Sequence, residues 1–160
     1  MERKLSTLDF ALRRKPYVKS SGGTFQSERN YLDVFIDGQL LCDCARQAGY
    51  DLVSILTNEW VPAEREKSVR RLLLREPADF PNDRRSLLVC SECGDIGCGA
   101  ISIVVDSSEK KTVWRDFGYE NTYEPEVHKE KLEGLGPFEF ATDEYERELL
   151  EALRQMKDFK

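Results

Sequence analysis

The feature that most constrains the fold of this chain is a pair of apolar segments joined by a short polar turn. Residues 100–106 place Ile101, Ile103 and Val105 on one face of an extended chain. After the turn the chain returns as residues 111–118, which are again rich in strand formers. The pattern predicts an antiparallel β-hairpin, and a two-stranded hairpin needs further elements against its apolar face to be stable.

Other segments predict additional strands. Residues 31–36 are rich in strand formers and end in Asp37-Gly38, a dipeptide that suits the positive φ angles of a tight turn. Residues 86–90 predict a strand that follows a loop with two prolines. Residues 51–57 are apolar but too few for periodicity to separate a buried strand from a helical turn, so this segment is assigned only to the core.

Three segments predict helices. Residues 40–48 carry apolar side chains at helical spacing, and Gly49 stands where a C-terminal cap is expected. Residues 63–76 are strongly helix-forming and stop before Pro77. At the C-terminal end, Thr142 is the predicted N-cap of a helix with acidic residues in its first turn and one apolar stripe.

The remaining segments read as irregular. Residues 1–30 contain Pro16 and a serine- and glycine-rich stretch, and they predict an irregular N-terminal segment. Residues 119–137 are acidic and interrupted by glycine and proline, which predicts a long loop. A length of 160 residues suits one domain. We therefore expect a single α+β domain over residues 1–160, with an antiparallel sheet of about four to six strands and helices packed on one side.

The composition predicts a protein of the cytoplasm. The longest apolar runs, 72–74 and 87–90, are far shorter than the roughly 20 residues of a membrane span. The N-terminus acquires Asp9 and then Arg13-Arg14-Lys15 where a signal peptide would be apolar. Five cysteines is an odd number and suits reduced thiols or a metal better than a secreted disulfide framework.

Charge is unevenly distributed along the chain. Residues 1–20 carry six Lys and Arg against two acidic residues, a net of +4. Residues 116–148 carry eleven Asp and Glu against three Lys and Arg, a net of −8. The total of −6 argues against nucleic acid as a partner, because phosphate binding depends on clustered cations. The acidic half suits a basic protein partner, although acidic residues also serve solubility alone.

The chain has one cysteine cluster, between the predicted strands 86–90 and 100–106. Cys90, Cys93 and Cys98 lie within ten residues that also contain three glycines. Cys-x-x-Cys-Gly at a strand end is typical of a zinc knuckle, so these three thiols are candidate ligands of a structural zinc. A structural zinc usually takes four ligands, and the fourth would have to be Cys42, Cys44, His128 or a carboxylate.

Two other interpretations of the cluster stay open. The thiols can be reduced bystanders in a glycine-rich turn. Thiol redox chemistry is disfavoured, because the loop leads into a strand and not into the helix N-terminus that lowers a thiol pKa. Cys42 and Cys44 point about 200° apart on a helix, so at most one of them can join a metal site. His128, the only histidine, lies in a loop rich in Lys and Glu and predicts a surface side chain.

Three stretches carry a resemblance to a known family. They are residues 90–99 (Cys-Ser-Glu-Cys-Gly-Asp-Ile-Gly-Cys-Gly), residues 113–120 (Val-Trp-Arg-Asp-Phe-Gly-Tyr-Glu) and residues 136–140 (Gly-Pro-Phe-Glu-Phe). Together they resemble a family of small, uncharacterised bacterial proteins with Cys-x-Glu-Cys-Gly-Asp-x-Gly-Cys-Gly and Trp-x-Asp-Phe-Gly motifs. The resemblance covers about the second half of the chain. It implies a bacterial protein and brings no activity or cofactor with it.

Two functions follow from these features. The first is a noncatalytic, cytoplasmic protein of the immunity or antitoxin kind, which neutralises a basic toxin through an acidic face. No nucleophile elbow and no phosphate-binding loop occurs in the sequence. The residues predicted to bind the partner are Asp116, Tyr119, Glu120, Tyr123, Glu124 and Glu126. The alternative is a zinc-stabilised or thiol-dependent enzyme centred on Cys90, Cys93 and Cys98.

Overall fold

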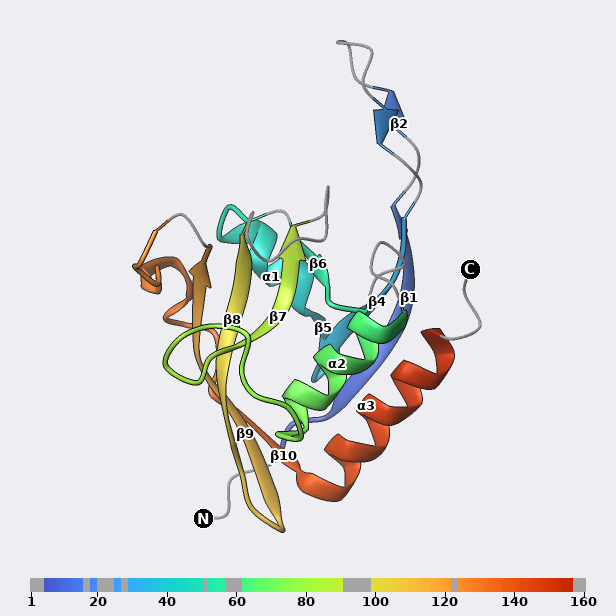
Figure 1. The fold of residues 1–160 in the computed structure, drawn as a ribbon, viewed down its shortest axis with the longest axis vertical. Helices are drawn as coiled ribbons and strands as arrows, with labels where there is room; N and C mark the ends of the chain where they lie inside the picture. Colours follow the sequence, from blue (N-terminus) through green and yellow to red (C-terminus); the bar gives the residue numbers. More distant parts are fainter. Residues whose placement is uncertain are drawn as a thin grey trace.

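The structure is a computed structural model that describes residues 5–15, 18–19, 25–26, 29–50, 52–56, 62–90, 99–121 and 124–156. Figure 1 shows the arrangement of its elements. In chain order these are β1 (Leu8–Lys15), β2 (Val18–Lys19), β3 (Phe25–Gln26), β4 (Arg29–Ile36), β5 (Gln39–Leu40), α1 (Leu41–Gln47), β6 (Leu52–Ser54), α2 (Pro62–Leu72), β7 (Arg85–Cys90), β8 (Ala100–Ser107), β9 (Lys111–Glu120), the 3-10 helix η2 (Glu130–Leu132), β10 (Phe138–Ala141) and α3 (Thr142–Met156).

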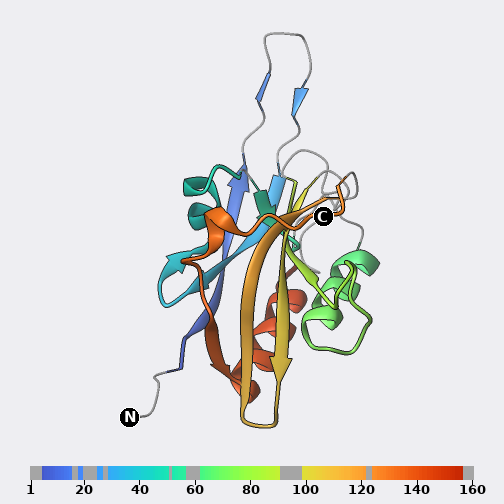
Figure 2. The ribbon, with the colours of Figure 1, turned by 90° about the vertical axis from the view of Figure 1, so that its left-hand side faces the viewer.

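Two antiparallel sheets form the body. The large sheet has the order β10-β9-β8-β7-β6 and the small sheet the order β1-β4-β5. Hydrogen bonds join them at both sides: Ser6 N donates to Glu139 O at 2.6 Å, and Leu32 N donates to Leu56 O at 2.9 Å. The strands therefore curve around a common interior (Figures 1 and 2). The predicted α+β class with an antiparallel sheet is confirmed.

The helices cover this sheet system from two directions. α2 packs on β7 and on α3, and α3 packs on β1, β4, β9 and β10. α1 packs on β4, β5 and β6. Along β4, Leu32 and Val34 are buried on one face, while Asp33 on the other face lies against Cys42 of α1. α2 and α3 thus share one side of the molecule, and α1 covers the opposite face of β4 (Figure 1).

An aromatic cluster joins the large sheet to α2 and α3. Trp114 on β9 is fully buried and meets Phe140 edge to face, with ring centroids 5.1 Å apart. Its Nε1 donates to the hydroxyl of Tyr145 on α3 at 3.0 Å. That hydroxyl in turn donates to the carbonyl of Leu72 at the end of α2, at 2.6 Å. This chain of hydrogen bonds therefore connects β9, α3 and the end of α2 within the core. Each of its polar groups has a partner, as buried polar groups require.

Several sequence predictions are confirmed. β8 and β9 form the predicted hairpin, and the three predicted helices correspond to α1, α2 and α3. Asp37 and Gly38 both have positive φ, 53° and 83°, as a tight hairpin turn requires. The ambiguous segment 51–57 contains β6. α2 ends at Leu72, earlier than predicted, and Leu74 follows with a φ of 60°.

Two predictions were wrong in detail, and one strand was not predicted. The segment 1–30, predicted to be irregular, contains Leu8–Lys15, which forms β1 and pairs with β4 along its whole length. No element was predicted for residues 138–141, which form strand β10 and pair with β9. Thr142 is the first residue of α3 and not its cap; its hydroxyl donates to Ser108 O at 2.8 Å, in the turn between β8 and β9.

Within the described ranges, no helix combines the length and the apolar character that crossing a membrane requires.

We expect Tyr145→Phe to lower the free energy of unfolding by about 1–3 kcal/mol, because it leaves Trp114 Nε1 and the Leu72 carbonyl buried without their partner. Urea denaturation followed by tryptophan fluorescence measures the change. Tyr50→Phe is the matched control, since Tyr50 is only half-buried, and a change within about 0.5 kcal/mol is expected for it. Equal losses in the two variants would contradict this account of the core.

Candidate partner-binding site

The second half of β9 carries three of the six residues that the sequence singled out, Asp116, Tyr119 and Glu120, and a β-bulge changes the register at Asp116. Ser102 pairs with Gly118 and Val104 with Arg115, so Ile103 faces two residues, Asp116 and Phe117. Asp116 has a φ of 58°, in the left-handed region that aspartate tolerates better than most residues. The extra residue bends the strand and frees backbone groups for other partners.

Arg84 supplies those partners. Its position is defined by a tight turn in which Phe80 N donates to Arg84 O at 3.1 Å, with Asn82 and Asp83 at positive φ. The guanidinium Nη2 donates to Ser102 O at 3.0 Å and to Asp116 O at 2.5 Å. Only 3% of Arg84 is exposed. A buried guanidinium therefore bridges the two strands at the bulge.

The same guanidinium neutralises two carboxylates. Nη1 donates to Asp116 Oδ2 at 3.0 Å, and Nε donates to Glu120 Oε2 at 3.1 Å. Glu120 Oε2 also accepts a short hydrogen bond from the Ser102 hydroxyl. Glu120 is 5% exposed. The prediction that Glu120 belongs to an exposed binding face was therefore wrong: its carboxylate is buried because it pairs with Arg84.

Asp116 has a second cationic partner. Lys129 Nζ lies 3.0 Å from Asp116 Oδ2, and the carboxylate keeps about a third of its surface exposed. Partial burial alone would raise the pKa of Asp116, but the hydrogen bond from Lys129 and the charges of Arg84 and Lys129 outweigh it and lower the pKa. Asp116 is thus ionised at neutral pH and already engaged within the chain.

The segment that supplies Lys129 runs along β9, and we call residues 124–137 the acidic strap. Backbone hydrogen bonds of 2.8 Å run in both directions between Tyr119 and His128. At Gly118 a Cβ would overlap the side chain of Val127, so glycine allows the strap to approach the strand. Leu132, in η2, is 3% exposed and anchors the strap in the core. The strap, which was predicted as part of a long loop, therefore packs against β9 and the core.

The cations of the strap are directed at other groups of the protein. Lys129 pairs with Asp116, and Lys131 Nζ lies 5.8 Å from the ring centroid of Tyr50, within cation–π range. His128 Nε2 lies 2.7 Å from Glu124 Oε2. The other carboxylates of the strap are exposed and form no ion pair with another described residue; they belong to Glu126, Glu130 and Glu133. The outer surface of the strap is consequently acidic.

Tyr119 occupies a different environment from its acidic neighbours. Its ring stacks on Tyr50, with centroids 4.4 Å apart and planes 6° from parallel. A Cβ at Gly99 would lie 2.8 Å from Tyr119 Cζ, so the ring covers the glycine that leads into β8. Tyr119 is half-buried. It holds the end of α1 against β9 and presents only part of its ring to a partner.

A pocket of about 310 Å³ opens between the strap and β9, and we call it the strap pocket. Phe117, Leu132, Leu135 and Pro137 provide apolar walls. Asp116, Lys129 and Glu133 provide charged groups. Its size and its mixture of apolar walls with a few charges suit a single side chain of a protein partner better than a large ligand.

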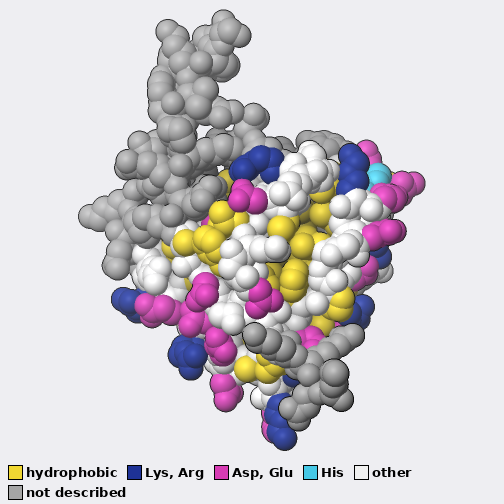
Figure 3. Space-filling view, turned by 180° about the vertical axis from the view of Figure 1, so that it is seen from behind, with side chains coloured by type: hydrophobic (Ala, Val, Ile, Leu, Met, Phe, Trp, Pro, Cys, Tyr) yellow, Lys and Arg dark blue, Asp and Glu magenta, His cyan; other side chains and the backbone are white. Residues whose placement is uncertain are grey.

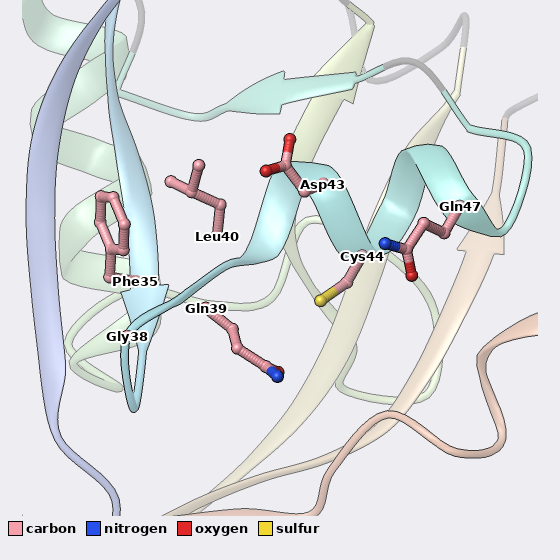
Figure 4. A pocket seen from close by; sticks show the side chains of 7 residues that line it. All are labelled: Phe35, Gly38, Gln39, Leu40, Asp43, Cys44 and Gln47. Carbon is pink, nitrogen blue, oxygen red and sulfur yellow. The ribbon is translucent and has the colours of Figure 1, made fainter.

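A second pocket of about 340 Å³, the α1 pocket, lies between β4, β5 and α1. Figure 4 shows Phe35 and Leu40 on one side and Gln39, Cys44 and Gln47 around the hollow. Burial, together with the nearby Asp43 carboxylate, raises the pKa of the Cys44 thiol. Burial raises the pKa of Cys42 as well. The thiolate is the reactive form of cysteine, and a raised pKa disfavours it. Neither thiol is therefore activated as a nucleophile.

The surface opposite α2 and α3 has an apolar centre. Figure 3 shows hydrophobic side chains gathered in the middle of this face, with both acidic and basic side chains toward its edges. Phe35 and Leu40 of the α1 pocket are partly exposed, and so is Leu135 of the strap pocket. An apolar centre with a charged rim is the composition of a protein–protein interface.

The cysteine prediction lies largely outside the described residues. Cys93, Cys98 and Tyr123 belong to segments that are not described, and only the backbone of Cys90 is placed, paired with Leu52 at the end of β7. In the part of the chain that is described, no group of three metal-ligating side chains is brought together. Zinc binding by Cys90, Cys93 and Cys98 stays a prediction.

Sequence reasoning did not find the residues that organise this site. Arg84, Gly118 and Lys129 act through partners that are distant in sequence; Arg84 and Glu120 are 36 residues apart. Of the residues predicted to bind a partner, Arg84 joins Asp116 and Glu120 on β9, whereas Tyr119 stacks on Tyr50 and Glu124 pairs with His128 of the strap.

No protein-family model, no curated protein and no solved structure matches this chain.

We expect Arg84→Met to lower the free energy of unfolding by about 3–5 kcal/mol, because Glu120 then stays buried without its cation. Adding Glu120→Gln removes that buried charge and should restore part of the loss. Urea denaturation of wild type, both single variants and the double variant measures the coupling. Additive losses in the double variant would contradict a direct interaction between the two side chains.

The hydrogen bond to Glu124, with the charges of Glu124, Glu130 and Glu126, raises the pKa of His128. The raised pKa means that this pair stabilises the fold below about pH 6.5 and loses its effect as pH rises through the folded-state pKa. His128 is the only histidine, so its Hε1 proton gives one NMR titration curve. Its midpoint should lie above about 6.5 in the wild type and fall toward that value in Glu124→Gln but not in Glu64→Gln.

Proposed function

We propose that this protein is a noncatalytic, cytoplasmic partner-binding protein of the immunity or antitoxin kind, which neutralises a basic toxin by covering it with the acidic strap. The observation that carries the proposal is the arrangement of charge on the strap. Lys129 and Lys131 contact Asp116 and Tyr50 of the same chain, while Glu126, Glu130 and Glu133 are exposed. Such a surface attracts a basic protein and accelerates its encounter.

The strap is also suited to binding by its rigidity. Paired backbone hydrogen bonds between Tyr119 and His128 and the buried Leu132 attach it to β9 and to the core. A surface that is already ordered loses little conformational entropy when a partner binds. The predicted binding set is revised accordingly: Glu124 and Glu126 stay in it, Glu130 and Glu133 join it, and Glu120 leaves it.

The strap pocket adds a place where binding energy can concentrate. Interface hot spots are side chains that fill well-packed pockets near the centre of the contact. A lysine or arginine of the partner would lay its aliphatic stem along Leu132 and Leu135 and bring its charge to Glu133. The apolar surface between this pocket and the α1 pocket would form the rest of the contact (Figure 3).

The test is affinity capture with the immobilised protein from a lysate of the organism that produces it, at 50 and 500 mM NaCl. Wild type should retain a basic protein at the lower salt concentration and release it at the higher one, since screening weakens exposed charge pairs. The variant Glu126→Lys/Glu130→Lys/Glu133→Lys should not retain it. Once the captured protein is identified, its toxicity in cells should be suppressed by wild type and not by this variant.

A matched control changes the same amount of charge elsewhere. Glu64→Lys/Glu109→Lys/Asp143→Lys reverses three exposed carboxylates away from the strap and should capture the same protein as wild type. Thermal melts verify that both variants are folded. If the two triple variants lose capture equally, net charge and not the strap is responsible. If wild type retains no basic protein at 50 mM NaCl, the proposed function is wrong.

A further inference from the structure

One carboxylate oxygen in the strap pocket is open to a ligand. Asp116 lines this pocket, and about a third of its side chain is exposed. Arg84 and Lys129 both bond to the same atom of Asp116, Oδ2, at 3.0 Å. Within the described residues, no donor or cation lies against the other oxygen, Oδ1. The carboxylate is therefore bonded to its own chain through one oxygen, while the second can accept hydrogen bonds from a ligand.

Glu133 adds a second negative charge to the strap pocket. Its side chain is exposed and makes no hydrogen bond or ion pair with the described part of the chain. The lining residues thus carry two carboxylates, of Asp116 and Glu133, against the single cation Lys129. Because Lys129 already bonds to Asp116, the charge of Glu133 has no counterpart in the pocket. A positively charged occupant is therefore favoured.

The walls of the pocket favour one kind of cation over the other. Phe117 and Leu132 are each 3% exposed, and Leu135 is half-buried. At Gly136 a Cβ would lie 3.0 Å from Phe117 Cε1, so the backbone of the strap lies against the phenylalanine ring. A guanidinium is planar and less strongly hydrated than an ammonium, and it donates in several directions. It can therefore lie against apolar walls and still donate to a carboxylate, whereas a lysine ammonium loses more of its hydration there.

We propose that the strap pocket is a binding site for a single arginine side chain, whose guanidinium donates to Asp116 Oδ1 and pairs with Glu133 while its stem lies along Leu132 and Leu135. That this arginine belongs to the basic partner rests on the proposed function, but the preference of the pocket for arginine over lysine does not. The inference narrows the contact from either cation to one of them. Arginine is also among the residues most enriched at the hot spots of protein interfaces.

The experiment is a two-dimensional proton–nitrogen NMR titration of the full-length protein, in 20 mM NaCl, with arginine blocked at both ends as N-acetyl-arginine N-methylamide. The amides of 116–118 and 132–136 should shift, with a Kd of about 1–10 mM. The same derivative of lysine should bind at least about threefold more weakly. The derivative of citrulline, which has the shape of arginine without its charge, should also bind at least about threefold more weakly. Nuclear Overhauser effects should connect the arginine δ-methylene to the methyl groups of Leu132 and Leu135.

Two carboxylates of the strap provide matched variants. Glu133→Gln removes a charge that lines the pocket and should weaken arginine binding about two- to fourfold. Glu130→Gln removes an exposed charge of the same strap that is not among the lining residues, and it should weaken binding by less than about 1.5-fold. Asp116→Asn should weaken binding at least about threefold. Should Asp116→Asn fail to fold, as its NMR spectrum would reveal, the comparison of Glu133→Gln with Glu130→Gln decides.

Three results would overturn the proposal. The first is equal affinity for the arginine and lysine derivatives, and the second is equal weakening by Glu133→Gln and Glu130→Gln. The third is the absence of shifts in the pocket at 50 mM blocked arginine; if a basic protein is nevertheless captured from the lysate, the proposed function stands without this site. If arginine binds in the pocket with the expected preference but no basic protein is captured, the arginine site stands and the proposed function is wrong.

Discussion

The guanidinium of Arg84 is the group on which the geometry of the site depends. It fills the space that the β9 bulge opens, bonds to the backbone of β8 and β9, and pairs with Asp116 and Glu120. Arginine suits this position because its planar fork donates in several fixed directions while it stays charged. Lysine in its place would reach one acceptor group and leave others unpaired. Through Asp116, the same group also fixes Lys129 and with it the strap.

The site therefore combines a buried ionic network with an exposed acidic surface. Each carboxylate near the bulge has a cation, and the glycine at 118 allows the strap to lie close enough for Lys129 to reach Asp116. The strap carries four carboxylates against Lys129 and Lys131, and each of these two lysines is engaged by a group of the same chain. The resulting surface is acidic, is joined to β9 by backbone hydrogen bonds and lies beside a pocket with apolar walls.

The sequence predicted the local elements well and the site only in part. Alternation at Ile101, Ile103 and Val105 was sufficient for the hairpin, because those residues form the core face of β8. β1 was missed although Leu8, Phe10 and Leu12 also alternate, since Pro16 and the serine- and glycine-rich stretch after it suggested an irregular segment. The burial of Glu120 depends on Arg84, a contact between distant segments that no local pattern reveals. The same holds for the stacking of Tyr119 on Tyr50.

The central claim is that the acidic strap is the binding surface for a basic protein. Hydrogen–deuterium exchange of the protein, alone and in complex with the basic partner captured from its host, tests it most directly. The account predicts that peptides from 124–137 exchange more slowly in the complex, while the exchange of peptides from α2 and α3 is unchanged. Protection confined to α2 and α3, with the strap exchanging as in the free protein, would contradict it.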